Sequence, residues 1–596
     1  MTEALRRARL MVAISLRADP FRSVAAVLTA TGQYASWPVR ALGLKLIANG
    51  ILDHRGTQAL AGAVIMIGLT FLNRVSAWWS FSIRARLREN TQLYLDTYLM
   101  DLVAAVPGVT HHELPEYADR MELIRTERTY LANPFNPISW TLASVVSTLT
   151  VIVLLGSVRP VLALLPLVGL PAAVANGRAD VSLENLLDSQ AEENRRLRHL
   201  LELATEPLAA KEVRLFGLGR EIVERHGALF AQLERARVRL AARNTAGVTA
   251  AWMVFGAGYA GAVLWSMHLA RTGAVSVGSV LLVLSLGAQM NMQLAELGWN
   301  VAWLIRTYRA VGRLVWLSDF AAEARAAADP PTRRPVPAVL RRGISFDSVS
   351  FAYPGTDRPV LQRVDLSLPR GATVAVVGEN GAGKTTLAKL LVRLYEPTSG
   401  RISVDGTDLR SFDIEEWRAR ISAGFQDFAR FELVARESIG VGSVPDMGSS
   451  AKVGAALARG AAEDLVEVLP QGLATQLGRE FDGTELSIGQ WQKTALGRAM
   501  MREAPLVLLL DEPTASLDAP TEHQLFERFA GAARQVANAQ GGVTILVSHR
   551  FSTVRMADLI VVLDGGAIEE LGNHDQLLAR GGRYAELYRL QASGYR

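Results

Sequence analysis

The chain has 596 residues, of which 49% are hydrophobic and 20% charged, and this composition excludes a disordered, fibrous or low-complexity protein. The 63 Lys and Arg exceed the 58 Asp and Glu by only five, too small a surplus to indicate a nucleic-acid partner. The absence of cysteine excludes disulfides, thiolate metal sites and cysteine nucleophiles.

The first residues form a short basic and apolar segment. Arg6, Arg7 and Arg9 precede the apolar run 10–16, and Asp19 and Pro20 follow it where a signal peptide has small cleavage-site residues. We therefore expect a surface-lying amphipathic helix rather than a signal peptide.

Six apolar stretches before residue 310 are long enough to cross a bilayer. A hydrocarbon core of roughly 30 Å requires about 20 helical residues. The first stretch is the weakest, because Arg40 and Lys45 interrupt it and Pro38 should kink it. The sequence therefore predicts an all-α six-helix transmembrane domain in residues 1–320, embedded in a lipid bilayer. The predicted spans are 22–50, 58–80, 138–157, 159–176, 246–270 and 276–305.

The distribution of basic residues predicts the orientation. Segments 81–137 and 177–245 are rich in arginine, whereas the short links between the other spans carry Arg55, Arg159 and Arg271. Because basic loops stay on the cytoplasmic side, both long segments and both termini should be cytoplasmic.

Residues 321–343 form a predicted linker, since they are rich in alanine and proline and poor in large apolar side chains. Short β-branched runs then alternate with helical stretches, which is typical of an α/β domain with a mainly parallel sheet. We place this domain at residues 344–596. The predicted strands are 373–377, 401–404, 506–510, 544–547 and 559–563.

A glycine-rich loop joins the first buried strand to a helix. Residues 378–385 read G-x-x-x-x-G-K-T, the P-loop pattern of NTP-binding proteins. Its backbone N–H groups can surround phosphate oxygens, while Lys384 would reach the β- and γ-phosphates and Thr385 would ligate Mg²⁺. The alternative, a glycine-rich surface turn, is disfavoured by the preceding strand. The candidate nucleotide-binding residues here are Gly378, Asn380, Gly381, Gly383, Lys384, Thr385 and Thr386.

Two acidic residues follow the apolar strand 506–510. Asp511 suits Mg²⁺, directly or through water, and Glu512 suits a general base that polarises the attacking water. By themselves adjacent acidic residues could equally begin a helix. Together with the glycine-rich loop they predict an ATP- and Mg²⁺-dependent hydrolase site.

These residues resemble the ATP-binding cassette of ABC transporters. Residues 486–490 (Leu-Ser-Ile-Gly-Gln) are similar to the family's signature, about a hundred residues after the loop. The resemblance implies that Tyr353 stacks on adenine, that Gln426 senses Mg²⁺, and that His549 reaches the γ-phosphate. It also implies that Asp518 communicates across a dimer.

The resemblance extends over the whole chain and implies a half-transporter of the exporter type. In that family two cassettes dimerise head to tail, so that Ser487, Gly489 and Gln490 of one chain would close over ATP on the other. The partner is either an identical chain or a second half-transporter. Segments 81–137 and 177–245 resemble the family's coupling extensions. In the second segment, residues 211–216 are either a coupling helix or an ordinary solvated helix.

Two features depart from the common family pattern. Ile488 replaces the usual signature glycine, which predicts working but slower hydrolysis. Residues 477–485, together with 489–493 and 426–428, are more similar to bacterial lantibiotic-type peptide exporters. The expected function is therefore ATP-driven export of a peptide or amphipathic small molecule across the bacterial cytoplasmic membrane. Lipid or multidrug export, a heterodimer with unequal sites, a non-transport cassette ATPase and a cassette-gated channel remain alternatives.

Overall fold

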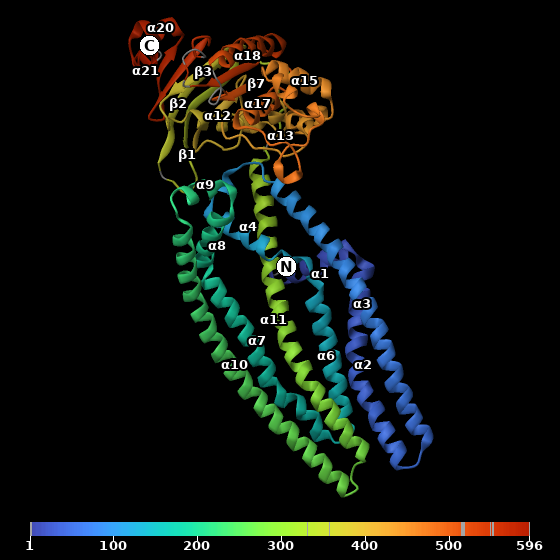
Figure 1. The fold of residues 1–596 in the computed structure, drawn as a ribbon. Coiled ribbons are helices and arrows are strands. Elements are labelled where there is room, and N and C mark those ends of the chain that lie inside the picture. The colour runs from blue at the N-terminus through green and yellow to red at the C-terminus, as the bar shows by residue number, and fades with distance from the viewer. Residues whose placement is uncertain are drawn as a thin grey trace. The chain divides into compact units, whose positions relative to one another are not determined.

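The computed structural model describes residues 3–330, 332–356, 358–513, 519–548, 550 and 554–594, without the side chains of 208, 519–527 and 591–594. The chain forms two compact units (Figure 1). Unit 1 comprises Met1–Leu102 and Arg120–Asp319, and unit 2 comprises Val103–Asp119 and Phe320–Arg596. We describe each unit by itself.

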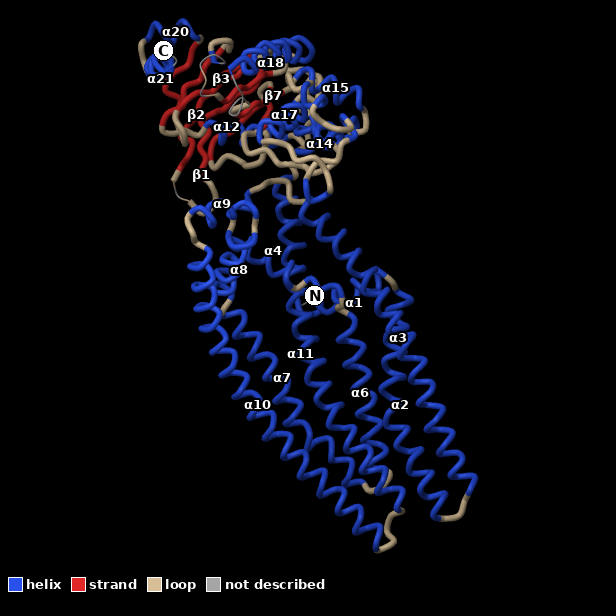
Figure 2. The backbone as a smooth tube through the Cα atoms, in the orientation of Figure 1, coloured by secondary structure: helices blue, strands red, loops and turns tan. Residues whose placement is uncertain are grey.

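Unit 1 is built from helices (Figure 2). Within it α2 packs along α6, and α10 packs along α7. Helices α3, α4 and α11 continue across the boundaries into unit 2. The helices are α1 (Glu3–Ala18), α2 (Pro20–Leu52), α3 (Gly56–Ala104), α4 (Pro115–Thr126), α5 (Arg128–Ala132), α6 (Phe135–Gly156), η2 (Pro160–Leu164), α7 (Leu165–Ser189), α8 (Ala191–Thr205), α9 (Pro207–Leu215), α10 (Gly219–Arg271) and α11 (Val277–Ala328).

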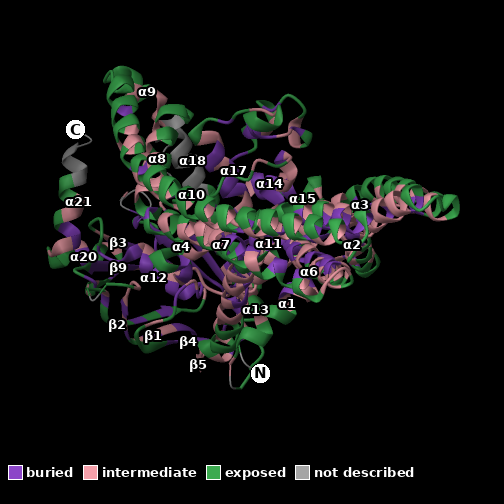
Figure 3. Ribbon diagram, turned by 90° about the horizontal axis from the view of Figure 1, so that it is seen from below, coloured by how far each residue is buried: buried purple, intermediate pink, exposed green. Residues whose placement is uncertain are grey.

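Five helical segments among the described residues are long and apolar enough to cross a membrane, so the predicted count of six spans is not confirmed. They are Gly56–Ala104, Phe135–Gly156, Pro160–Ser189, Gly219–Arg271 and Val277–Ala328. The predicted first span lies in α2, which is helical over 33 residues but contains Arg40 and Lys45 in its apolar stretch. Many residues of the long helices are exposed, as the green ribbon in Figure 3 shows, and large apolar residues are among them. Lipid can cover such surfaces.

Unit 2 contains two sheets. The six-stranded sheet has the order β10-β9-β3-β8-β7-β6, with β10 antiparallel to β9 and the other neighbours parallel. The four-stranded sheet, β2-β1-β4-β5, is antiparallel. The mainly parallel sheet is therefore confirmed, but the predicted strand 401–404 belongs to the second, antiparallel sheet. The strands are β1 (Gly343–Ala352), β2 (Pro359–Pro369), β3 (Thr373–Gly378), β4 (Ser399–Val404), β5 (Thr407–Asp408), β6 (Ile421–Gly424), β7 (Val507–Asp511), β8 (Val543–Val547), β9 (Leu559–Asp564) and β10 (Ala567–Gly572).

Helices cover the six-stranded sheet, and its central strands are buried along their length, as in parallel sheets generally. Trp417 and Trp491 are the largest fully buried side chains of the two main cores. The predicted linker begins as helix, because α11 runs on to Ala328. The helices of unit 2 are η1 (Thr110–Glu113), α12 (Lys384–Leu391), η3 (Leu409–Ser411), α13 (Ile414–Ala419), α14 (Ala435–Gly440), η4 (Val441–Asp446), α15 (Ser450–Arg459), α16 (Asp464–Glu467), η5 (Gly472–Ala474), η6 (Arg479–Phe481), α17 (Ile488–Ala499), α18 (Ala519–Gln540), α20 (His574–Arg580) and α21 (Arg583–Gly594).

Candidate functional site: a phosphate loop, two acidic residues and a signature helix

The phosphate loop runs from the end of β3 to the start of α12. Gly378, Gly381 and Gly383 all have positive φ, at 153°, 85° and 101°, a region that side chains rarely adopt. A Cβ on Gly378 would lie 2.2 Å from the carbonyl oxygen of Leu563. The glycines are therefore required by the path of the backbone, and they leave the N–H groups of the loop free of side-chain cover.

Lys384 is the first residue of α12 and is buried. Its Nζ donates to the carbonyl oxygens of Gly378 at 2.8 Å and Glu379 at 2.9 Å. Burial lowers the pKa of Lys384, an effect that the nearby Glu512 and Asp511 partly oppose. The ammonium group is thus held inside the loop, where an incoming phosphate would meet it.

The geometry at Thr385 and Asp511 fits a magnesium ion. Because β3 and β7 both flank β8 in the parallel sheet, the loop and Asp511 lie at the same edge, and Thr385 Oγ1 donates to Asp511 Oδ2 at 2.9 Å. Asp511 Oδ1 is buried and has no hydrogen-bond partner among the described residues. Burial raises the pKa of Asp511, which indicates a cost of keeping the carboxylate charged. Oxygen atoms of this kind are the ligands that Mg²⁺ prefers.

Gln426 and Glu512 meet across the same edge of the sheet. Gln426 Nε2 donates to Glu512 Oε2 at 2.9 Å. Both residues, with Asp511, line a cavity of about 330 Å³. Gln426 follows β6 and Glu512 follows β7, which are adjacent parallel strands, so the sheet topology itself brings them together.

Tyr353 lies beside the phosphate loop. Its hydroxyl and the Thr386 hydroxyl are 2.9 Å apart and share a hydrogen bond. The ring of Tyr353 packs edge-on against Phe351 and Tyr395, with centroids 5.0 and 5.3 Å away. An aromatic ring is therefore held within reach of the loop, which fits its expected contact with a nucleotide base.

The signature residues begin α17. Ser487 is the N-cap: its Oγ accepts from Gln490 N at 3.3 Å, and its own N donates to Gln490 Oε1 at 2.8 Å. Nothing lies within 4 Å of a Cβ placed on Gly489, and Ile488 is 63% exposed. No hydrogen bond joins these residues to the phosphate loop within the described part of the chain. The signature therefore faces outward, as a surface that closes over another chain requires.

Two predicted site residues, Asp518 and His549, lie outside the described residues. The structure places the other predicted site residues in two groups. The phosphate loop, Gln426, Asp511 and Glu512 come together at one sheet edge, with Tyr353 beside the loop. The signature residues stand apart at the N-terminus of α17, although Ile488 lines the cavity that contains Glu512.

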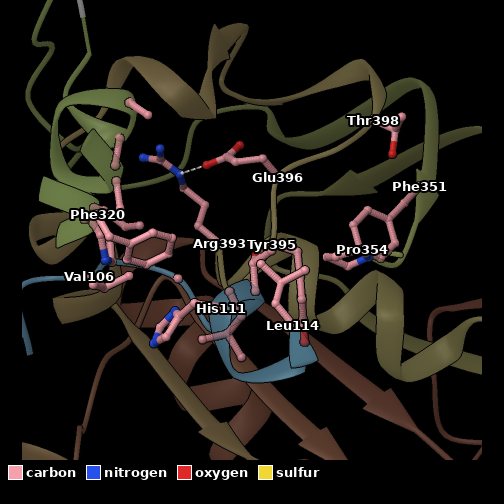
Figure 4. Close-up of a pocket in the computed structure, with 18 of the residues that line it drawn as sticks. Val106, His111, Leu114, Phe320, Phe351, Pro354, Arg393, Tyr395, Glu396 and Thr398 are labelled. Atoms are coloured by element: carbon pink, nitrogen blue, oxygen red, sulfur yellow. Dashed lines mark hydrogen bonds and ion pairs between the residues drawn. The ribbon is translucent and has the colours of Figure 1, made fainter. Parts of the chain in front are cut away.

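Residues 103–119 belong to the unit of the cassette, which sequence reasoning did not identify. Val109 N donates to Leu394 O at 3.2 Å, and the Tyr395 hydroxyl donates to Glu113. The segment, the end of α11 and the cassette surround a pocket lined by His111, Phe320 and Tyr395 (Figure 4). The sequence indicated that residues 81–137 form a long basic segment that resembles a coupling extension, but not which of its residues pack on the cassette.

In unit 1, polar contacts join α11 to α2 and to α6. Tyr34 OH donates to Glu296 Oε2 at 2.8 Å, and Gln293 Nε2 donates to Ser147 Oγ at 2.6 Å. From the sequence alone, Glu296 could be either a residue that contacts cargo or a residue near the membrane interface. In the structure Glu296 accepts the Tyr34 hydroxyl, so it links α11 to α2 within the bundle.

The site defined by this fold is that of a P-loop ATPase attached to a bundle of membrane-spanning helices. Residues 361–515 match the family described as ABC transporter. Over 97% of this chain and 98% of the other, the fold is similar to a bacterial Atm1-family ABC exporter solved with ATP bound, with a TM-score of 0.77 and 25% sequence identity.

Curated relatives include proteins named ATP-dependent lipid A-core flippase. The one from Thiobacillus denitrificans is 40% identical over 265 residues, 44% of each chain. The one from Chromobacterium violaceum is 42% identical over 253 residues, 42% of this chain and 41% of the relative. The chain thus spans less than half the length of the curated relatives it matches. The comparisons do not support the expected similarity to lantibiotic-type peptide exporters.

The chain therefore combines a helical membrane domain with one domain that matches the ABC transporter family, and its fold is similar to that of an Atm1-family ABC exporter. It is a multi-pass protein of the plasma membrane whose ATPase domain is cytoplasmic.

Proposed function

We propose that this protein is an ATP-hydrolysing exporter that works as a dimer and moves a lipid or lipid-like amphipathic molecule across the bacterial cytoplasmic membrane. The observation that carries the ATPase part is the arrangement at one sheet edge. There Thr385 and the unpaired, buried Oδ1 of Asp511 lie beside the Gln426–Glu512 pair. The names of the curated relatives favour a lipid over the peptide that we expected from residues 477–485.

In the proposed mechanism the phosphate loop binds the β- and γ-phosphates through its N–H groups and Lys384. Thr385 and Asp511 would hold Mg²⁺, which supplies positive charge against the phosphate oxygens. Glu512 accepts a proton from the attacking water, and Gln426 orients its carboxylate by the hydrogen bond to Oε2. The amide of Gln426 is neutral, so Glu512 is the member of this pair that acts as the base.

Two cassettes are needed in this proposal because the signature of one chain must meet the ATP of the other. Nucleotide then binds the closed dimer more tightly than the open one, and this difference in affinity shifts the population toward closure. Helical extensions such as residues 103–119, and by proposal 211–216, transmit the change to the membrane helices. Hydrolysis removes the γ-phosphate contacts and resets the dimer.

The test uses the purified full chain in lipid nanodiscs. Glu512→Gln should bind Mg·ATP with near-parent affinity and hydrolyse it at least about 100-fold more slowly, because the amide cannot accept the proton. Hydrolysis by Glu512→Gln at the parent rate would exclude Glu512 as the base. Activity of the parent chain alone favours a homodimer, whereas activity only with a second half-transporter favours a heterodimer.

The cargo is tested with the same preparation. Lipid A, phospholipids and amphipathic peptides are compared as stimulators of ATPase activity, and a fluorescent lipid is followed across proteoliposome membranes with and without ATP. ATP-dependent lipid movement that Glu512→Gln abolishes supports lipid export. Stimulation and transport by peptides alone would refute it.

A further inference from the structure

The backbone of Glu512 adopts an unusual conformation. Its φ is 47°, in the left-handed region that is unfavourable for residues other than glycine. The next residue is Pro513, which further disfavours a helical conformation at the residue before it. Such a conformation persists only where the surroundings hold it in place, so the backbone contacts on either side of Glu512, together with the Gln426 hydrogen bond to its Oε2, decide where its carboxylate points.

Two hydrogen bonds flank Glu512. On one side its own N–H donates to Val547 O of β8 at 2.9 Å, which continues the sheet. On the other side Gln492 Nε2 of α17 donates to Pro513 O at 2.8 Å. The first bond is backbone to backbone, and the second depends on one side chain.

Gln492 is almost fully buried, with 6% of its surface exposed. Its Oε1 has no hydrogen-bond partner among the described residues, and leaving a buried acceptor unpaired carries a desolvation cost. A leucine of similar size would not carry that cost. The hydrogen bond from Gln492 Nε2 to the carbonyl oxygen of Pro513 therefore explains why an amide occupies this buried position.

The same helix carries the signature. Ser487 caps α17, and Ile488 and Gln492 line the 330 Å³ cavity that Glu512 also lines. Because a helix moves as a rigid body, a displacement of its N-terminus is passed on to Gln492 and through it to Pro513.

We infer that Gln492 is a positioning residue for Glu512. Its hydrogen bond to Pro513 couples the orientation of the Glu512 carboxylate to the position of the signature helix α17. The inference rests on the proposed role of Glu512 and deepens it. In the proposed dimer, the signature helix that closes over one ATP would also set the base that serves the other ATP.

Two variants test the hydrogen bond, both in the full chain in nanodiscs. Gln492→Leu removes the donor, and we expect kcat for ATP hydrolysis to fall about 10- to 100-fold, the range for misplacement of a reacting group, with the ATP dissociation constant within about twofold of the parent. Gln492→Glu can donate only when protonated, and burial raises the pKa of the introduced carboxyl. Its kcat relative to the parent should therefore rise as the pH is lowered from 8 to 6, whereas that of Gln492→Leu stays constant.

Thr494→Val is the matched control. Thr494 is also buried on α17, but its Oγ1 donates to Gln490 O of its own helix, so kcat should stay within about twofold of the parent. The inference is overturned if Gln492→Leu keeps the parent kcat, or if the relative kcat of Gln492→Glu does not depend on pH. These outcomes differ from failure of the proposed function, in which the parent chain itself shows no ATPase activity or Glu512→Gln hydrolyses ATP normally.

Discussion

Protonation of His111 should loosen residues 103–119 from the cassette. His111 is 4% exposed, its Nε2 is buried without a hydrogen-bond partner among the described residues, and its ring contacts those of His112, Tyr117 and Phe320. Burial, with a smaller effect of His112, lowers the pKa of His111 from 6.5 to about 4. The folded segment therefore holds a neutral imidazole.

The sign follows from proton binding. Between pH 6.5 and 4 the released segment binds a proton that the docked segment does not, so docking is fully stable above pH 6.5 and weakens as the pH falls toward 4. With a pKa of 6.5 in the released segment and about 4 in the docked segment, the free energy of docking at pH 5 is less favourable by about 2 kcal/mol. This is a change of about 30-fold in the docking equilibrium.

The assay is hydrogen–deuterium exchange of peptides from residues 103–119 in the purified full chain, at pH 7.5 and 5.0, with rates corrected for intrinsic exchange. Protection should fall about 30-fold at pH 5. His111→Phe, which keeps a ring of similar shape, should lose most of this pH dependence, and His112→Phe should keep most of it. Equal acid sensitivity in His111→Phe and the parent would refute the reasoning.

Three further predictions concern the nucleotide site. Gly378→Ala should weaken ATP binding at least about 10-fold in a nucleotide titration, because its Cβ would lie 2.2 Å from a backbone oxygen; parent affinity would contradict the geometry. Asp511→Asn should raise the Mg²⁺ concentration needed for half-maximal ATPase activity about 10- to 100-fold. In the parent chain this Mg²⁺ concentration should rise at acid pH, because burial raises the pKa of Asp511. Ile488→Gly should increase kcat several-fold by opening the signature surface, and an unchanged or lower kcat would show that Ile488 does not slow hydrolysis.

The sequence predicts the cassette well because its signals are local. The strands at β3, β7, β8 and β9 are short apolar runs bounded by turn residues, and the glycine pattern at 378–383 requires a loop of one shape. The parallel order of the strands then brings Asp511 to Thr385 without further information. The pairing of β1 with β4, in contrast, depends on contacts between segments about fifty residues apart, and no local pattern announces it.

The remaining features depend on tertiary contacts. The basic composition of residues 81–137 shows a loop outside the membrane, but not that residues 103–119 pack on Leu394 and Tyr395. The left-handed backbone of Glu512 is also hidden in the sequence, where glutamate before proline suggests an extended residue. It arises because β8 and α17 each bind one side of the same turn.

Helix α2 shows the same limit in the membrane domain. Apolar composition alone ranks it last among the predicted spans, because free energies of insertion penalise charged and polar side chains. In the structure several uncharged polar side chains of α2 bind neighbouring helices, whereas Arg40 Nε is buried with no hydrogen-bond partner among the described residues. Tyr34 donates its hydroxyl to Glu296 of α11, and its carbonyl accepts from Ser147 of α6. Polar side chains that bind a neighbouring helix are not presented to lipid. Such hydrogen bonds between helices, which hydropathy does not measure, therefore help to hold α2 in the bundle.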